Sequence, residues 1–206
     1  MSIRAIIWDL GGVLLRTEDG SARLRWEERL GLQPGSLERL LFDNEVAQQA
    51  SVGLATADQV WTWLLRRLDL PESDRQALVD GLFGGDRVDP VLMAYIRGLR
   101  PAHKVGMITN AWSEIRVALE NEWHIADAFD PLVISAEVGL VKPDPRIYRL
   151  ALERLGVPPE EAVFIDDFEV NVAGARAVGM MAIRFCSADQ VLEDLEALLG
   201  ENGEGR

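Results

Sequence analysis

This chain has little of the chemistry that marks secreted, thiolate-metal or membrane proteins. Its 206 residues include one cysteine, Cys186, and two histidines. A single cysteine makes no internal disulfide and no thiolate metal site, so we expect a reducing compartment and a cytoplasmic protein. No stretch reaches the roughly 18 uninterrupted apolar residues of a spanning helix. Asp9 interrupts the apolar run near the N-terminus, so no signal peptide is expected.

Positive charge is also scarce. The chain has 34 acidic against 21 basic residues, a formal net charge of -13. This field repels nucleic-acid backbones and anionic membranes, so we expect neither as a partner. A small anionic substrate needs a local cation or a cluster of donors to offset the field. Internal repeats are absent too, and a composition of 48% hydrophobic and 27% charged residues is typical of a folded globular protein.

Five short apolar runs predict buried strands. They cover residues 3–8, 104–109, 131–135, 162–166 and 180–185. Each run is continuous rather than alternating, which is typical of parallel strands covered on both faces. Helical patterns alternate with the later runs, at residues 89–100, 113–123, 144–156, 168–179 and 189–200. The alternation predicts an α/β fold with a doubly wound, Rossmann-like parallel sheet.

This alternation fails between the first two predicted strands. Residues 16–87 give four amphipathic helical patterns and no convincing strand. The block is too long for a single crossover connection. We therefore predict a core made of residues 1–15 and 88–206, with residues 16–87 as an inserted helical cap domain. Ligands of open α/β sheets bind beyond the carboxyl ends of the strands, where the insert leaves the core, so the cap is expected to roof the site.

Polar residues stand at the ends of several predicted strands. They are Asp9, the pair Thr109 and Asn110, the pair Asp166 and Asp167, and Lys142 in a nearby loop. Taken singly, each is an ordinary turn former, helix cap or loop residue. Parallel strands bring all these ends to one edge of the sheet, however, and neighbouring carboxylates repel unless a cation binds or one is protonated. Together they predict one site.

Phosphoryl transfer is the chemistry that these acids suit. The Asp9 carboxylate can attack phosphorus to give an aspartyl-phosphate, which divides a difficult hydrolysis into two easier steps. A hard cation such as Mg²⁺ would neutralise phosphate charge. Its expected ligands are Asp9, the backbone carbonyl of Gly11, and Asp167, with Asp166 close by or acting through water.

Other residues at this edge are expected to hold the phosphate. Lys142 would hold the transferring oxygens as a point charge, while Thr109 and Asn110 donate hydrogen bonds. Gly11 and Gly12 let the backbone turn tightly after Asp9, and we expect them to expose their N–H groups to an oxyanion.

Four stretches resemble, in order and spacing, the four motifs of the haloacid dehalogenase-like hydrolase superfamily. They are IIWDLGGVL, ITN, GLVKPDPRIY and FIDDFEVNVAGA. The match spans the whole chain, and the helical insert resembles the C1-type cap of that superfamily. The resemblance implies Asp9 as nucleophile, Thr109 as phosphate-binding residue, Lys142 as the motif-three lysine, and Asp166 and Asp167 as metal-binding acids.

One position departs from the pattern. Most phosphatases of this superfamily have a second aspartate, acting as general acid and base, where this chain has Gly11. Glycine cannot move a proton, and losing such a group typically costs on the order of 10² to 10⁴ in rate. The D-L-G-G stretch is similar to that of glucose-1-phosphatase-like and epoxide hydrolase N-terminal-like phosphatases.

Three hypotheses therefore stay open. The preferred one is a Mg²⁺-dependent phosphatase of a small phosphorylated metabolite, such as a sugar phosphate, because the similar D-L-G stretch belongs to a phosphatase sub-branch. The second is a 2-haloacid dehalogenase, in which Asp9 displaces halide without a metal. The third is a non-catalytic phospho-ligand-binding protein. We expect a monomer or a homodimer, and the sequence names neither the substrate nor a replacement for the missing acid.

Overall fold

A five-stranded parallel sheet forms the centre of the protein. The computed structural model describes residues 2–100 and 102–200. The strands are ordered β5-β4-β1-β6-β7, and every neighbouring pair is parallel. They are β1 (Ala5–Trp8), β4 (Lys104–Thr109), β5 (Leu132–Ile134), β6 (Ala162–Asp166) and β7 (Met181–Arg184). Each lies within one of the five predicted runs, and the expected doubly wound α/β fold is confirmed.

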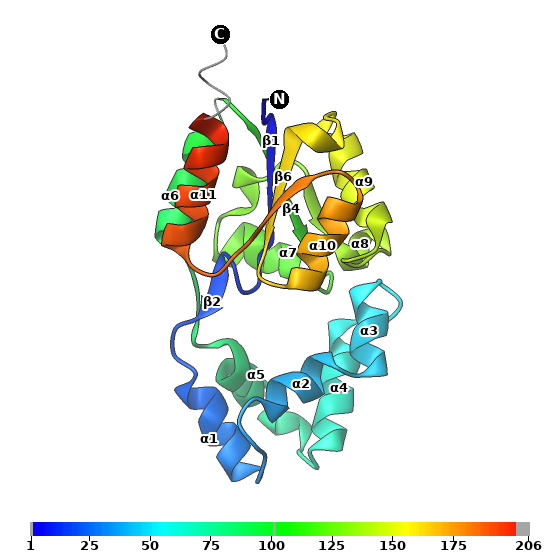
Figure 1. Cartoon of the computed structure of the whole chain (residues 1–206). Coiled ribbons are helices and arrows are strands. Elements are labelled where there is room, and N and C mark those ends of the chain that lie inside the picture. The colour runs from blue at the N-terminus through cyan, green and yellow to red at the C-terminus, as the bar shows by residue number, and fades with distance from the viewer. Residues whose placement is uncertain (1, 101, 201–206) are drawn as a thin grey trace.

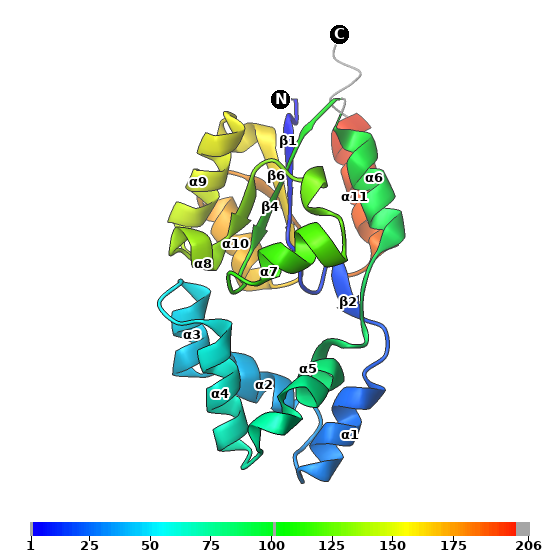
Figure 2. The ribbon, with the colours of Figure 1, turned by 180° about the vertical axis from the view of Figure 1, so that it is seen from behind.

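Helices cover both faces of this sheet (Figures 1 and 2). One face carries α6 (Pro90–Leu99) and α11 (Ala188–Gly200), and the other carries α8 (Ser135–Val138), α9 (Pro145–Leu155) and α10 (Glu169–Ala177). Side chains alternate across β1, so Ile6 and Trp8 join one hydrophobic cluster while Ala5 and Ile7 join the other. Burial on both sides explains why the strands are continuously apolar.

The pattern at residues 113–123 gives a less regular helix than predicted. α7 (Ile115–Val117) passes directly into a π-helical turn, η2 (Ala118–Glu122). Three short 3₁₀ turns complete the connections: η1 (Glu72–Asp74), η3 (Ala126–Ala128) and η4 (Pro159–Glu161). No helix in the ranges 2–100 and 102–200 is long and apolar enough to cross a membrane.

A separate group of helices lies beyond the carboxyl ends of the strands, in the lower half of Figure 1. We call residues 21–83 the helical unit. Its helices are α1 (Ser21–Arg29), α2 (Ser36–Phe42), α3 (Glu45–Ser51), α4 (Ala57–Arg67) and α5 (Arg75–Phe83). They enclose their own hydrophobic cluster, which includes Leu41, Val60, Leu64 and Leu82.

The prediction of four helices in this unit is wrong, because the second pattern forms two. The break falls at Asp43 and Asn44, where the Asn44 side chain accepts a hydrogen bond from Ala47 N and caps α3. An asparagine cap satisfies a backbone donor that a continuous helix would have satisfied with a carbonyl. Apolar periodicity continues across the cap, so the pattern alone hides the break.

The prediction that residues 16–87 contain no strand is also wrong. β2 (Leu15–Thr17) and β3 (Asp86–Val88) pair antiparallel as the chain leaves and re-enters the core. The Thr17 hydroxyl donates to Asp86, with 2.5 Å between Oγ1 and Oδ1. Strands of three residues are too short to show a period of two, which is why the sequence pattern misses them. The two-stranded ladder links the helical unit to the core.

Candidate active site

The sheet brings the predicted acids together. Asp9 directly follows β1, and its N–H donates to Ile165 O at 2.9 Å, so it lies beside the end of β6. Asp166 ends β6 and Asp167 follows it. Each of the three carboxyl groups offers an oxygen, and these oxygens lie within 4.8 Å of one another. Parallel register therefore places residues more than 150 positions apart at one edge.

Lys142 lies between two of these acids. Its Nζ is 2.7 Å from Asp9 Oδ1 and 2.7 Å from Asp166 Oδ2. The lysine side chain is 1% exposed, and those of Asp9 and Asp166 are 8% and 0% exposed. A buried ammonium persists only when it is paired, and here two carboxylates share it. The ring of Phe164 lies beneath it, 5.5 Å from Nζ to the ring centre.

Both oxygens of Asp166 are already occupied by protein donors. Asn171 Nδ2 lies 3.0 and 3.1 Å from the two oxygens, and Phe168 N donates to Oδ1 at 2.8 Å. Lys142 Nζ supplies a third donor, to Oδ2, and with it a fourth hydrogen bond. Direct coordination of a metal by Asp166 would have to displace one of these bonds. The geometry suits Asp166 better to holding Lys142 in place.

Asp167 has the opposite property. Its Oδ1 is buried and has no hydrogen-bond partner in the described part of the chain. An unpartnered buried carboxylate oxygen is unfavourable unless a cation meets it. The contacts of Asp9 with Lys142 and Leu10 N both use Oδ1, which leaves Oδ2 for another ligand. Two carboxylate oxygens on neighbouring strand ends therefore fit a hard divalent cation such as Mg²⁺.

Burial also weakens the acidity of these groups. It raises the pKa of Asp9 to about 7, helped by the negative Asp166 and opposed by Lys142. Burial and the same neighbour raise the pKa of Asp167. A carboxylate must be ionised to act as a nucleophile, and a bound cation would favour the ionised form. The electrostatics thus point to a positively charged ligand.

The two glycines after Asp9 behave differently from each other. Gly12 has φ +76°, and a Cβ there would lie 2.2 Å from Asp167 Oδ2. Its N–H donates to Leu15 O at 3.0 Å, so the expectation that it faces an oxyanion is wrong for Gly12. The tight turn uses this donor internally. A Cβ at Gly11 would have no heavy atom within 4 Å, so Gly11 borders open space.

The two predicted hydrogen-bond donors after β4 also differ. Thr109 is 3% exposed, and no hydrogen bond within the described chain uses its hydroxyl. The Asn110 amide, by contrast, is paired with the backbone of Lys142. Its Nδ2 donates to Lys142 O at 3.0 Å, and its Oδ1 accepts from Lys142 N at 2.8 Å. Thr109 therefore keeps a free hydroxyl for a ligand, while Asn110 joins two loops.

The helical unit touches the core at this same edge. The rings of Phe42 and Trp112 are 5.6 Å apart, and Trp112 lies three residues after Thr109. At Gly53, φ is +76° and a Cβ would lie 2.3 Å from Ala136 O, at the start of α8. Ala57 N donates to Glu114 Oε1 at 3.4 Å. The contacts flank the loops that carry the candidate site.

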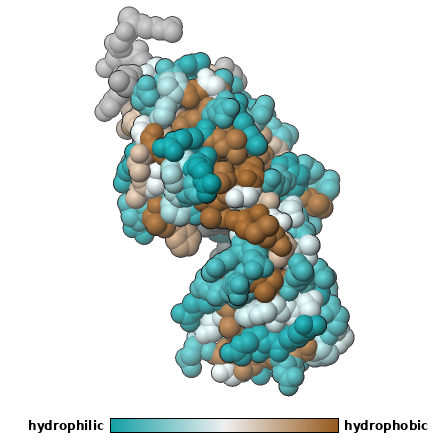
Figure 3. All heavy atoms as spheres, turned by 90° about the vertical axis from the view of Figure 1, so that its right-hand side faces the viewer, coloured by the Kyte–Doolittle hydropathy of each residue, from teal (hydrophilic) through white to brown (hydrophobic). Residues whose placement is uncertain are grey.

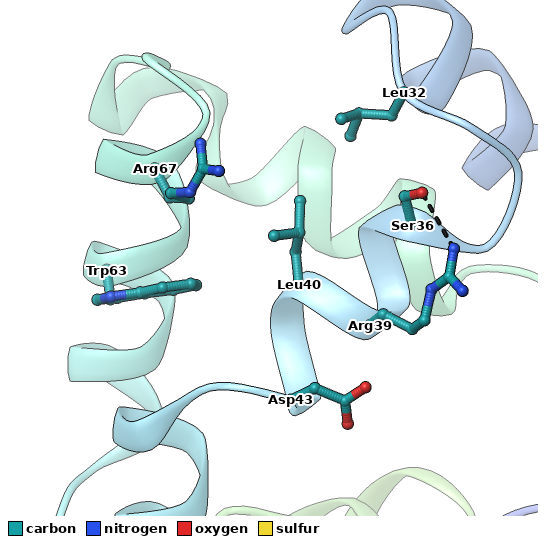
Figure 4. Close-up of a pocket in the computed structure, with 7 residues that line it drawn as sticks. All are labelled: Leu32, Ser36, Arg39, Leu40, Asp43, Trp63 and Arg67. Carbon is teal, nitrogen blue, oxygen red and sulfur yellow. Dashed lines mark hydrogen bonds between the residues drawn. The ribbon is translucent and has the colours of Figure 1, made fainter.

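Two cavities lie away from these residues. One, of about 430 Å³, lies between α2 and α4 (Figure 4), and the other, of about 280 Å³, lies near the start of β4. Neither is lined by a predicted site residue. The surface in Figure 3 shows hydrophobic side chains extending over the core toward its junction with the helical unit. Exposed apolar residues include Leu54, Phe168 and Val170.

A doubly wound parallel sheet with three aspartates and a buried lysine at its carboxyl edge is the arrangement of a Rossmann-like α/β enzyme. The chain belongs to the haloacid dehalogenase-like hydrolase family, whose model matches residues 3–179. The resemblance seen in the four sequence stretches is thereby confirmed.

Proteins similar in sequence to this chain are named for more than one reaction. Bifunctional epoxide hydrolase 2 of Mus musculus is 30% identical over 219 residues, which cover 97% of this chain and 39% of that protein. The chain thus spans well under half the length of that relative. Phosphatase MT3486 of Mycobacterium tuberculosis is 30% identical, with 96% of both chains covered. Sesquiterpene phosphatase astK of Aspergillus oryzae is 28% identical, with 97% and 98% covered.

Solved structures share the fold at lower identity. A HAD family enzyme of Bacteroides thetaiotaomicron in complex with magnesium and inorganic phosphate has a TM-score of 0.75 and 22% identity, covering 91% of this chain and 96% of that one. A 2-haloacid dehalogenase of Pseudomonas syringae has a TM-score of 0.62 and 24% identity, covering 97% and 99%. Identities this low establish a shared fold only, so the reaction has to be inferred from the residues of the site.

Proposed function

We propose that this protein is a Mg²⁺-dependent phosphatase that hydrolyses a small phosphorylated metabolite through an aspartyl-phosphate on Asp9. The observation that carries the proposal is the pairing of Asp9 with a buried Lys142, beside the unpartnered Oδ1 of Asp167. Two relatives that align over nearly their whole length are named as phosphatases, which supports the same reaction.

The proposed reaction assigns a role to each of these side chains. An oxygen of Asp9 attacks phosphorus, the bond from phosphorus to the ester oxygen breaks, and the ester oxygen takes a proton from solvent and leaves as the alcohol. Water then attacks the phosphorus of the aspartyl-phosphate, which releases inorganic phosphate and restores Asp9. Lys142 favours the ionised nucleophile and would attract the phosphoryl oxygens, and the buried Thr109 hydroxyl would donate to one of them.

Asp9, Asp167 and the Gly11 carbonyl are the proposed ligands of Mg²⁺, with Asp166 behind them. When bound, the cation offsets the negative charge shared by the phosphate and these carboxylates. Because Gly11 has no side chain to protonate the leaving oxygen, we propose substrates whose leaving group needs little protonation, such as sugar 1-phosphates. The helical unit, within residues 16–87, is proposed to act as the cap over a core of residues 1–15 and 88–206.

A panel of phosphate monoesters tests this function. Hydrolysis should require Mg²⁺, stop with chelator, and be lost in Asp9→Asn, while Asp127→Asn keeps the wild-type rate. Asp127 is a suitable control because its side chain is 72% exposed and pairs only on the surface, with Arg97. Mg²⁺ should also raise the Tm of the wild-type protein and leave that of Asp167→Asn unchanged, because only a ligand of the folded state stabilises it.

Either of two experimental results would contradict this proposal and assign a different function. Release of chloride from chloroacetate that persists with chelator would assign a metal-independent dehalogenase. Mg²⁺-dependent binding of inorganic phosphate without any burst on 4-nitrophenyl phosphate would assign a non-catalytic phospho-ligand-binding protein.

A further inference from the structure

The loop after β4 and the segment after β5 are joined by hydrogen bonds that no strand pairing supplies. The ladder between β4 and β5 ends at the pair Thr109 and Ile134. Directly beyond it, Ser135 Oγ accepts from Ala111 N at 3.0 Å and donates to Ala111 O at 3.1 Å. One buried hydroxyl therefore satisfies both backbone groups of a residue that has left the sheet.

Asn110 makes a matching pair of bonds one residue earlier. Its amide satisfies both backbone groups of Lys142, at 3.0 and 2.8 Å. We call these four hydrogen bonds, formed by the side chains of Asn110 and Ser135, the loop seam. The seam connects the loop after β4 to the first residue of α8, Ser135, and to Lys142, which follows that helix. Ser135 is 0% exposed, so water cannot replace its bonds without a structural change.

The seam fixes the backbone from which the Lys142 side chain reaches the acids. Lys142 Nζ must lie 2.7 Å from two carboxylates at once, a condition that a freely moving loop would not maintain. Lysine also has a long side chain with high rotamer entropy, so a fixed backbone is needed to hold its head group. The Lys142 backbone N–H and C=O are both held by one asparagine side chain.

We propose that Asn110 and Ser135 are positioning residues that hold Lys142 against Asp9 and Asp166, and that the Asn110 side chain acts through Lys142 rather than on the phosphate. The role in turnover rests on the proposed phosphatase function, whereas the placement of Lys142 does not. Misplacing a catalytic group by about 1 Å can lower a rate by about 10²-fold, which sets the expected effect.

A double-mutant cycle tests the role in turnover. Asn110→Ala should lower kcat/KM for 4-nitrophenyl phosphate by about 10²-fold. In a Lys142→Met background the same change should lower it by no more than about twofold, the scatter of independent effects. Ser135→Ala should show the same dependence on Lys142. Asn121→Ala, an exposed asparagine on η2, is the control and should leave the rate unchanged.

Equal losses in both backgrounds, with weaker inhibition by inorganic phosphate, would overturn the proposal and make Asn110 a direct phosphate ligand. Crystal structures of Asn110→Ala and of the wild type decide the placement without any turnover. Lys142 Nζ should leave its position between the two carboxylates in the variant, and an ammonium still 2.7 Å from both would also overturn the proposal. Should the wild type hydrolyse nothing, the crystal structures alone still decide whether the seam positions Lys142. Should Ser135→Ala fail to fold, the Asn110 variants carry the test.

Discussion

Gly11 and Gly12 are adjacent, yet their surroundings make opposite demands on them. Gly12 is confined by Asp167 and adopts a left-handed backbone that disfavours any side chain. Gly11 has no positive φ and borders open space. At the scale of single residues, then, only Gly12 is needed for the geometry of the turn. Gly11 matters for the side chain that it lacks.

Gly11→Asp should therefore add a proton donor without disturbing the fold. The new Cβ meets no heavy atom within 4 Å, so the variant is expected to keep wild-type stability. Hydrolysis of alkyl phosphates, whose leaving oxygen needs a proton, should rise by up to about 10²-fold, with little change for aryl phosphates. Steady-state rates across a series of leaving-group pKa values measure this. An equal change for all leaving groups would contradict a general-acid role.

Gly12→Ala should be harmful in two separable ways. The left-handed backbone costs an L-residue roughly 1–2 kcal/mol, and the Cβ must push Asp167 away. Urea unfolding should show the first effect, and loss of the Mg²⁺-induced rise in Tm the second. Gly35→Ala is the control, because Gly35 also has a positive φ, +77°, but an added Cβ would have no neighbour within 4 Å. It should lower stability and keep the Mg²⁺-induced rise in Tm. A Gly12→Ala variant whose Tm still rises with Mg²⁺ would contradict the contact between the added Cβ and Asp167.

The sequence predicted which acids gather at the carboxyl edge of the sheet, but not how the side chains there pair. Parallel strands end at one edge of a sheet, so a gathering of Asp9, Asp166 and Asp167 there could be predicted without coordinates. The direction of a side chain does not follow from spacing. The sequence therefore assigned Asn110 to phosphate, although its amide holds Lys142, and it gave no reason to select Ser135. Hydrogen bonds between a side chain and a distant loop backbone depend on where the two groups lie in space, which residue spacing does not give.

At the scale of elements, the sequence predicted what is long, periodic or strongly capped. Asp144 and Pro145 open α9, and Gly156 ends it in a left-handed conformation, as these residue types commonly do at helix ends. Elements of three residues were missed because β2 and β3 contain too few positions to show a period. The break between α2 and α3 was missed because apolar spacing continues through a polar cap.

The return from the helical unit depends on one such cap. Asp89 Oδ1 accepts from Val91 N and Leu92 N at the start of α6, and Oδ2 pairs with Arg16 at 2.5 Å. Burial alone would raise the pKa of Asp89, but the hydrogen bonds from Leu92 and Arg16 outweigh it and hold the pKa below its ordinary value. The ionised form is therefore favoured by folding, and Asp89 ties the hinge strand β2 to the first core helix that follows.

Asp89→Asn keeps a capping oxygen and removes the charge, so it should cost about 1 kcal/mol of unfolding free energy at pH 7. Because the folded pKa is depressed, the stabilisation is complete above the unfolded value of about 3.9 and is lost as pH falls through the folded value. The difference between wild type and variant should shrink as the pH falls below about 4. Urea unfolding from pH 7 to pH 3 measures this, and a difference that stays constant would exclude the charge as its source.

At the scale of the whole molecule, two separately packed bodies meet at the edge that holds the chemistry. The sheet core has its hydrophobic clusters on both faces, and the helical unit has its own. They are joined by the β2–β3 ladder and by close contacts such as Phe42 with Trp112 and Gly53 with Ala136. Two bodies with separate hydrophobic clusters can change their separation while each keeps its own packing.

Gly53→Ala should separate these bodies without unfolding either. The added Cβ would lie 2.3 Å from Ala136 O, so the loop after α3 must move away from α8. We expect a larger radius of gyration by small-angle X-ray scattering, and a kcat/KM lower by about tenfold because a displaced cap positions substrate less well.

Gly31→Ala is the matched control, since φ is +66° there and a Cβ would meet no atom within 4 Å. Both variants should lose similar stability through backbone strain, roughly 1–2 kcal/mol. Scattering that changes equally in both variants would show that strain, and not the contact with Ala136, controls how the helical unit sits on the core.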